Sequence, residues 1–156
     1  MRTLSKKTQY ALRALYALAR ARGRWLLISE LASHERIPKK FLEQILLKLK
    51  AKGLVASKKG KGGGYQLAED PRLVTLGQVI RLVEGPLGPL PCASEPERQK
   101  CDECEDDRYC ETRLVMREIR DQTARILDGT SLADACRRAD EARAECERGA
   151  ELMYYI

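Results

Sequence analysis

Apolar residues recur at helical spacing three times in the N-terminal part of the chain. The first run predicts a helix over 5–21, with the hydroxyl of Ser5 as its N-terminal cap. Residues 25–28 form a short apolar stretch that we expect to be strand-like, and residues 29–34 fit a short second helix. A third helix opens with Pro38, because proline suits the first position of a helix. Its apolar residues follow the i, i+3, i+4, i+7 pattern of a buried face: Leu42, Ile45, Leu46 and Leu49.

A β-hairpin with a basic tip is predicted directly after the third helix. Gly53 closes that helix, in the position where a positive φ is often needed. Residues 54–58 and 65–67 fit two short strands that flank the segment 59–64, Lys-Gly-Lys-Gly-Gly-Gly. Three helices followed by a basic hairpin is the order of a winged helix-turn-helix domain. The predicted fold class is therefore mainly α with a small β-wing.

The second half of the chain predicts further helices around a cysteine-rich segment. A fourth helix fits residues 75–84, and the Gly- and Pro-rich stretch after it reads as a stiff linker. A long helix is expected from about Arg108 to Leu127. The segment Ser131-Leu-Ala-Asp134 has the pattern of a capping box and opens a last helix. We expect three parts: a winged helix-turn-helix domain over 1–84, a linker and cysteine-rich loop over 85–110, and a dimerisation helix with a C-terminal helix over 111–156.

The positive charge of the chain is concentrated in its N-terminal part. Residues 1–90 hold 18 Lys and Arg against 6 Asp and Glu, whereas residues 91–156 hold 11 basic and 17 acidic residues. This asymmetry favours contact with nucleic acid by the first part and a different task for the second. No apolar run reaches the roughly 20 residues of a membrane span, and the N-terminus lacks the apolar region of an export signal. We therefore expect a soluble, cytoplasmic protein.

The third predicted helix carries long polar side chains off its apolar stripe. Such side chains reach guanine edges or phosphates in the major groove, and Gln44 can pair with adenine. Glu43 can accept a hydrogen bond from cytosine N4, although it can also be an ordinary surface residue. In the hairpin, glycines allow close approach to the DNA backbone and lysines supply charge. The candidate DNA-binding residues are Lys39, Lys40, Glu43, Gln44 and Lys48 on the helix, and Lys59, Lys61, Gly62, Gly63 and Tyr65 on the hairpin.

Four of the six cysteines lie close together, with the spacing C-x8-C-x2-C-x5-C. Clustered cysteines in a chain without an export signal bind metal more often than they form structural disulfides. The spacing leaves an iron–sulfur cluster, a zinc ion and redox-active thiols open, although it lacks the paired knuckles usual for zinc. Cys136 and Cys146 have no ligand spacing, and we expect them to be free thiols or packing residues. The candidate metal ligands are Cys92, Cys101, Cys104 and Cys110.

Several short motifs form a specific set along the chain. They are Met-Arg-x-Leu-Ser-Lys at the start with Tyr10-Ala11 after it, Phe41-Leu-Glu-Gln44, Leu54-Val-x-Ser, Gly60-x-Gly-Gly-Gly-Tyr65, Gly77-x-Val-Ile80, and Leu127-Asp-x-x-Ser-Leu-Ala-Asp134. To about residue 138 the chain resembles the iron–sulfur cluster regulator superfamily of winged-helix transcription regulators, the IscR/NsrR/CymR-like proteins. The resemblance implies a homodimer with crossing long helices that binds two half-sites of double-stranded DNA. One face of the long helix is then the expected dimer interface: Met116, Ile119, Thr123 and Ile126.

The resemblance also implies a ligand set for an iron–sulfur cluster. Cluster-binding members typically use three cysteines before the long helix; here the final C-x5-C ends at Cys110, and Cys92 falls at the first ligand. Some relatives use a histidine three residues after the last cysteine, where this chain has Arg113. Others use an acidic residue from the first helix of the partner, where the nearest position here is Gln9. We infer that Cys101 completes an all-cysteine set, which suits a 2Fe–2S or a 4Fe–4S cluster.

The sequence thus predicts a dimeric DNA-binding transcription regulator whose affinity is controlled by a cysteine-ligated iron–sulfur cluster. The alternative is the same fold without a cluster, acting as a zinc-bound or thiol-redox-switched repressor. An enzyme with a small-molecule substrate is not expected, because the single histidine, His34, has no apparent acid or nucleophile partner. Cluster binding or loss is expected to reorder the 92–110 loop and so to shift the spacing of the two recognition helices.

Overall fold

The first three helices form because each buries one apolar face against the others. Helix α1 (Lys6–Arg20) begins where the Ser5 hydroxyl accepts a hydrogen bond from the Thr8 N–H at 3.2 Å, as the sequence predicts. Helix α3 (Lys39–Ala51) packs against α1, and helix α2 (Ile28–His34) packs against α3. Every predicted core residue of α3 is buried, and each such leucine or isoleucine contributes about 1.5–3 kcal/mol by leaving water.

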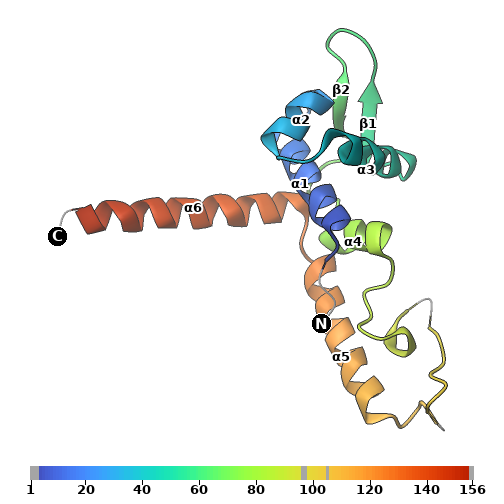
Figure 1. Ribbon diagram of the computed structural model, residues 1–156. Helices are drawn as coiled ribbons and strands as arrows, with labels where there is room; N and C mark the ends of the chain where they lie inside the picture. Colours follow the sequence, from blue (N-terminus) through green and yellow to red (C-terminus); the bar gives the residue numbers. More distant parts are fainter. Residues whose placement is uncertain (1–3, 96–97, 105, 155–156) are drawn as a thin grey trace.

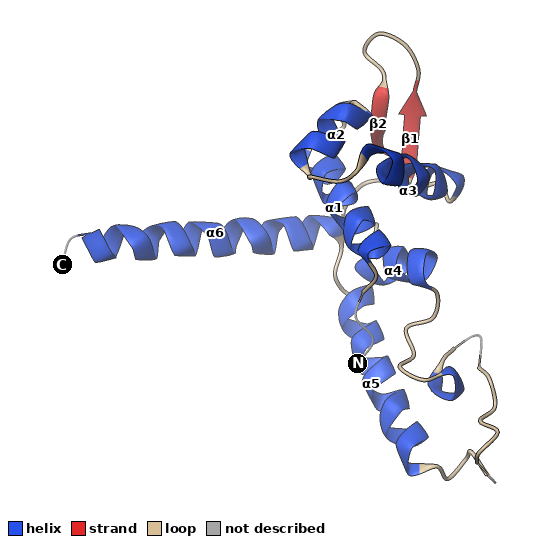
Figure 2. Cartoon of the chain, viewed as in Figure 1, coloured by secondary structure: helices blue, strands red, loops and turns tan. Residues whose placement is uncertain are grey.

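The computed structural model describes residues 4–95, 98–104 and 106–154 and shows a helical body with two long helices leading away from it (Figures 1 and 2). The fold is mainly α with a small two-stranded wing, which confirms the predicted fold class. None of the helices in these described ranges is long and apolar enough to cross a membrane. After α3 the elements are β1 Val55–Lys58, β2 Gly64–Leu67, α4 Leu76–Glu84, the 3₁₀ helix η1 Pro91–Ala93, α5 Glu111–Asp128 and α6 Leu132–Tyr154.

The wing is an antiparallel hairpin whose register runs from Val55 opposite Leu67 to Lys58 opposite Gly64. Its base is joined to the body by Leu26, whose N–H and C=O both bond to the backbone of Tyr65, at 2.9 and 2.8 Å. The predicted strand-like stretch at 25–28 is thus reduced to this single bridge, because α2 already begins at Ile28. The hairpin extends outward from α3 at the top of Figure 1.

Two predicted helix starts were wrong by one to three residues. Pro38 does not occupy the first helical position: its ψ of 125° is not helical, and its carbonyl instead accepts the N–H groups of Phe41 and Leu42. The long helix does not begin near Arg108 but at Glu111. Arg108 turns back onto the carboxylate of Asp106 through its backbone N–H and its guanidinium, and this turn holds the chain out of the helix.

The helical extension is fastened to the winged domain at both ends of α4. The backbone of Leu76 donates to Thr130, and Asp128 at the end of α5 accepts two hydrogen bonds from Arg81, at 2.6 and 2.7 Å. Gly77 leaves room for this pair, because a Cβ there would overlap the Asp128 carboxylate. The predicted capping box opens α6: the Asp134 N–H donates to the Ser131 hydroxyl at 3.0 Å.

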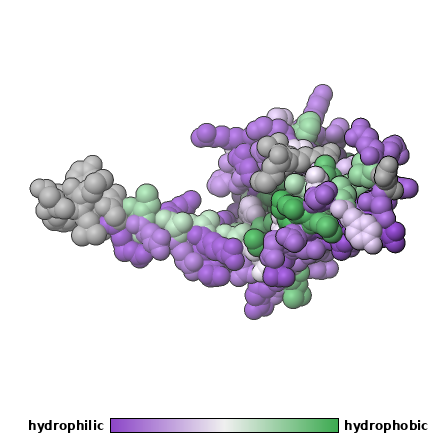
Figure 3. All heavy atoms as spheres, turned by 90° about the horizontal axis from the view of Figure 1, so that it is seen from below, coloured by the Kyte–Doolittle hydropathy of each residue, from purple (hydrophilic) through white to green (hydrophobic). Residues whose placement is uncertain are grey.

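Helix α6 begins against the winged domain and then leaves it. Arg20 of α1 donates to both carboxylate oxygens of Asp140 and to the carbonyl of Cys136. Beyond these contacts α6 continues as the straight arm on the left of Figure 1. From below, Figure 3 shows hydrophobic side chains gathered on the body and a thin pale-green line among the charged residues of the arm.

Candidate functional site

The polar face of α3 is directed to solvent because the opposite face supplies the core. Of the residues predicted to contact DNA from this helix, Lys39, Lys40, Glu43 and Gln44 are exposed, and Lys48 is half-buried. Across the residues that the structure describes, Glu43 makes no hydrogen bond or ion pair with another side chain. An unpaired carboxylate on a basic helix is available to accept from a base.

The wing presents Lys59 and Lys61 at its tip, where both side chains are exposed. Gly62 lies between them and the strand, with a φ of +74° and open space around its α-carbon. The other two predicted wing residues hold the hairpin together. A Cβ on Gly63 would overlap the carbonyl oxygen of Lys58, and the ring of Tyr65 packs against the hydrophobic core.

The basic helix and the wing are directly linked to each other. The Lys50 ammonium donates to the Ser57 hydroxyl at 2.6 Å and so links the last turn of α3 to β1. Phe41, which belongs to one of the motifs, is 45% exposed on the same helix, and its ring meets Tyr10 edge-on at 6.1 Å. Phe41 is therefore an exposed aromatic residue beside the polar residues of α3, and sequence reasoning did not single it out.

Three of the four clustered cysteines are neighbours at the start of α5. Cys110 is the residue before the first turn, and the backbone of Cys104 turns back onto Cys101. Hydrogen bonding of the Cys104 thiol with Cys101, and next with Cys110, raises the pKa of Cys104 to about 12. These three cysteines are half-buried, so solvent and small molecules can still reach them.

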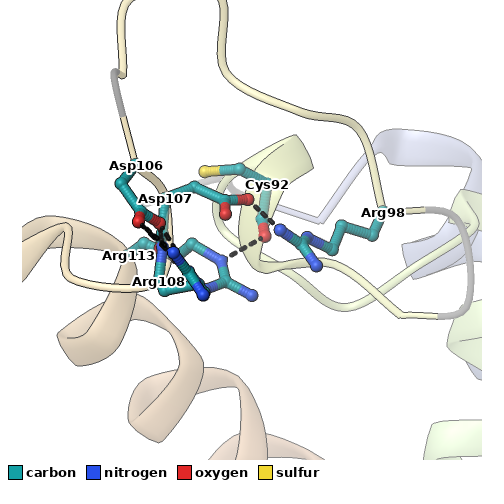
Figure 4. Close-up of polar contacts among 6 residues, drawn as sticks. All are labelled: Cys92, Arg98, Asp106, Asp107, Arg108 and Arg113. Carbon is teal, nitrogen blue, oxygen red and sulfur yellow. Dashed lines mark hydrogen bonds and ion pairs between the residues drawn. The ribbon is translucent and has the colours of Figure 1, made fainter.

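Cys92 reaches the same region from the other end of the loop. It lies in η1, and its carbonyl accepts a hydrogen bond from Arg113 of α5 at 3.1 Å. In Figure 4 its sulfur points toward the Asp106–Asp107 segment that leads into Cys110. The candidate ligands are thus four thiols from one loop, and thiols are the ligand type that both iron–sulfur clusters and zinc use. Within the described residues no three His, Cys, Asp or Glu side chains are already gathered at metal-holding distance.

Two buried arginines border this loop, and sequence reasoning missed their role. Arg113 and Arg120 are the buried residues of α5; Arg113 donates to two backbone carbonyls of the cysteine loop and Arg120 to one. Gln9 lies outside this cluster, with its side-chain amide donating to the Leu4 carbonyl at 2.8 Å. Cys136 is half-buried beside the Tyr16 carbonyl, and Cys146 is exposed on the arm.

Several apolar side chains of α5 are exposed to solvent. Ile126 is 64% exposed and Ile119 40%, while Met116 is half-buried and Thr123 is exposed. Ile119 and Thr123 line a groove of about 280 Å³ that α4 and the linker complete. Val115 is also exposed on α5 and extends the expected dimer face by one residue.

A three-helix domain with a two-stranded wing, basic on its third helix and its hairpin tip, defines the winged-helix transcription regulators. Comparison with known proteins narrows the class. The chain belongs to the Rrf2 family, described as iron-dependent transcriptional regulators, whose family model matches residues 4–138. Regulators of this family bind DNA and are typically dimeric, and the relatives are transcription regulators, not enzymes.

The similarity extends over most of the chain. An HTH-type, rrf2-like regulator of Rhodobacter capsulatus is 40% identical over 135 residues, which are 84% of this chain and 90% of that protein. The structure of CymR, the global cysteine regulator of B. subtilis, has a TM-score of 0.72 at 30% identity, covering 88% of this chain and 98% of that one. T. potens IscR also has a TM-score of 0.72, at 29% identity and 90% coverage of each chain.

Proposed function

We propose that this protein is a homodimeric, cytoplasmic transcription regulator whose affinity for DNA is controlled by an iron–sulfur cluster held by Cys92, Cys101, Cys104 and Cys110. One observation carries the proposal: both ends of the cysteine loop are attached at the start of α5, since Cys110 is the residue before its first turn and the Cys92 carbonyl accepts a hydrogen bond from Arg113. When bound, the cluster supplies a redox-active, iron-dependent crosslink between the two ends of the loop.

Control of DNA binding follows from where the loop lies. The cysteines border α5, whose exposed isoleucines are the proposed contact with a second copy of the chain. A change in the loop that shifts α5 also shifts the two α3 helices relative to each other. Winged-helix dimers bind half-sites about 34–36 Å apart, so a small shift in this spacing alters the affinity for an operator.

The DNA interface predicts a steep dependence of affinity on salt. If the basic residues of α3 and the wing contact about six phosphates, affinity falls about 10³-fold between 50 and 200 mM salt, because counterions are released on binding. Lys59→Ala or Lys61→Ala is expected to weaken binding to all sequences alike. Glu43→Ala is expected to relax specificity at one base pair by about 1–3 kcal/mol.

These DNA effects are measured by titrating labelled duplexes with systematically varied half-sites at several salt concentrations. Lys100→Ala is the matched control, because Lys100 is an exposed lysine in the cysteine loop and not on the proposed interface. An unchanged sequence preference in Glu43→Ala would return Glu43 to the role of an ordinary surface residue.

The cysteine site predicts that serine at any one of its four positions removes most of the iron. Thiolates are the ligands of iron–sulfur clusters, and a hydroxyl binds iron more weakly. Each variant is purified without oxygen and compared with the wild type by absorbance, iron content and sulfide content. Cys136→Ser and Cys146→Ser are the controls, and Gln9→Ala is expected to keep full iron because a carboxamide is a poor ligand. A Cys101→Ser protein with full iron and an unchanged spectrum would remove Cys101 from the ligand set.

The second candidate is the same fold without a cluster, switched by zinc or by thiol oxidation. The position of Cys104 between Cys101 and Cys110 favours it, because adjacent thiols can form a disulfide by giving two electrons and two protons to an oxidant. Similarity to CymR, a global cysteine regulator, supports it too. Anaerobically purified protein with zinc, or with neither iron nor sulfide, would select this candidate.

A further inference from the structure

The buried face of α5 is made by arginines. Arg113 is 8% exposed and Arg120 9%, and they lie two helical turns apart on one side of the helix. Arginine is almost never fully buried without partners. Here most of the partners belong to the cysteine loop, so hydrogen bonds and an ion pair hold this loop against the buried side of the helix.

Arg113 connects the two ends of the cysteine loop through one guanidinium group. Its Nε donates to the Cys92 carbonyl at 3.1 Å, and its Nη1 donates to the Asp107 carbonyl at 2.8 Å (Figure 4). Two backbone segments far apart in the sequence are thereby held side by side. The Asp107 carboxylate is itself paired with Arg98, which adds a second tie across the loop.

Arg120 extends this attachment along the helix. Its Nη1 donates to the Ala93 carbonyl at 2.7 Å and lies 3.2 Å from the Glu95 carboxylate. Asp121 accepts from its remaining nitrogens at 2.8 and 2.6 Å and keeps the guanidinium in place. Residues 92–95 are therefore fixed against α5 at two successive points.

The chemistry of these contacts assigns a role to the two arginines. A guanidinium has five N–H donors and no lone pair, so Arg113 does not ligate a metal. Its planar fork matches two carbonyls that converge on it, which the single ammonium of a lysine cannot reproduce. We propose that Arg113 and Arg120, the arginine clamp, are positioning residues that hold Cys92 against the start of α5 and make the loop move with the dimerisation helix.

The clamp is tested by the reactivity of Cys92 in reduced, metal-free, full-length protein. Alkylation by iodoacetamide is followed by mass spectrometry. Arg113→Gln is expected to raise the rate at Cys92 about tenfold, because loss of two hydrogen bonds lets residues 91–95 open more often. Arg113→Lys keeps the charge without the fork and is expected to give a similar rise. Arg125→Gln, which removes an exposed arginine from the same helix, leaves the rate within about twofold.

An unchanged Cys92 rate in both Arg113→Gln and Arg120→Gln overturns the proposal. If circular dichroism shows that Arg113→Gln does not fold, Arg113→Lys and Arg120→Gln provide the same comparison, since each keeps part of the clamp. The positioning role rests on the proposed function in one respect only, namely the identity of the group that the cysteine thiols bind. If the wild type purified without oxygen holds no iron, and the metal-free variants still differ from it in Cys92 rate, the cluster is rejected and the clamp is supported. If the wild type as purified does hold iron, and all variants have equal Cys92 rates once the metal is removed, the clamp is rejected.

Discussion

Replacing both Ile119 and Ile126 by aspartate is expected to convert the protein into monomers and to lower its affinity for a two-half-site operator about 10²–10⁴-fold. The buried residues of α5 are the two arginines of the clamp, whereas Ile126 is 64% exposed and Ile119, at the edge of the groove beside α4 and the linker, is 40% exposed. A carboxylate buried between two α5 helices would lose its hydration without gaining a partner. A monomer binds one half-site at a time and so loses the increase in affinity that comes from joining two DNA-binding domains in one dimer.

Sedimentation velocity at micromolar concentration measures the assembly, and titration of duplexes with one or two half-sites measures the linkage. Leu114→Asp is the matched control: Leu114 is 43% exposed on the same helix, but about a third of a turn away from Val115, Ile119 and Ile126. The double variant should keep the wild-type affinity for a single half-site. A well-folded wild-type monomer at micromolar concentration would contradict the dimer and the control of half-site spacing that depends on it.

The winged domain was predictable because its elements follow local rules. On α3 the apolar residues recur with the helical period, and the structure buries all of them. Helix ends were equally visible in the sequence. The hydroxyls of Ser5 and Ser131 accept hydrogen bonds from N–H groups of the first helical turn, and Gly53 adopts the positive φ that follows α3. The errors at Pro38 and Arg108 lie at helix starts, where a single turn or carbonyl decides between neighbouring residues.

The geometry of the cysteine site was only partly predictable. Sequence spacing groups Cys101, Cys104 and Cys110, since they are close along the chain, but among the described residues no three such side chains are gathered at metal-holding distance. The attachment of Cys92 depends instead on Arg113, whose partners are backbone carbonyls. Every residue has a carbonyl, so no residue type marks such a partner, and a buried arginine on a charged helix has the same sequence signature as an exposed one.

Gly64→Ala is expected to lower the free energy of unfolding by about 2–4 kcal/mol and to abolish specific DNA binding, the second large effect predicted here. Gly64 has a φ of +140°, which side-chain-bearing residues rarely adopt, and a Cβ there would overlap the carbonyl of Leu26. Leu26 has no freedom to withdraw, because its N–H and C=O are both bonded to Tyr65. To accept the methyl group, the base of the wing must therefore separate from the body, with loss of two hydrogen bonds of about 0.5–1.5 kcal/mol each.

Urea denaturation followed by circular dichroism measures the stability, and Gly60→Ala separates the two causes of the loss. Gly60 lies in the same hairpin with a φ of +89°, but nothing lies within 4 Å of a Cβ built on it. Gly60→Ala therefore adds backbone strain alone and is expected to cost about 1–2 kcal/mol. Gly63→Ala tests the clash alone, because a Cβ there overlaps the Lys58 carbonyl but the backbone has no positive φ. Its loss of stability is expected to lie between those of Gly60→Ala and Gly64→Ala. Equal losses in Gly64→Ala and Gly60→Ala would show that strain alone sets the cost and that the Leu26 bridge does not hold the wing to the body.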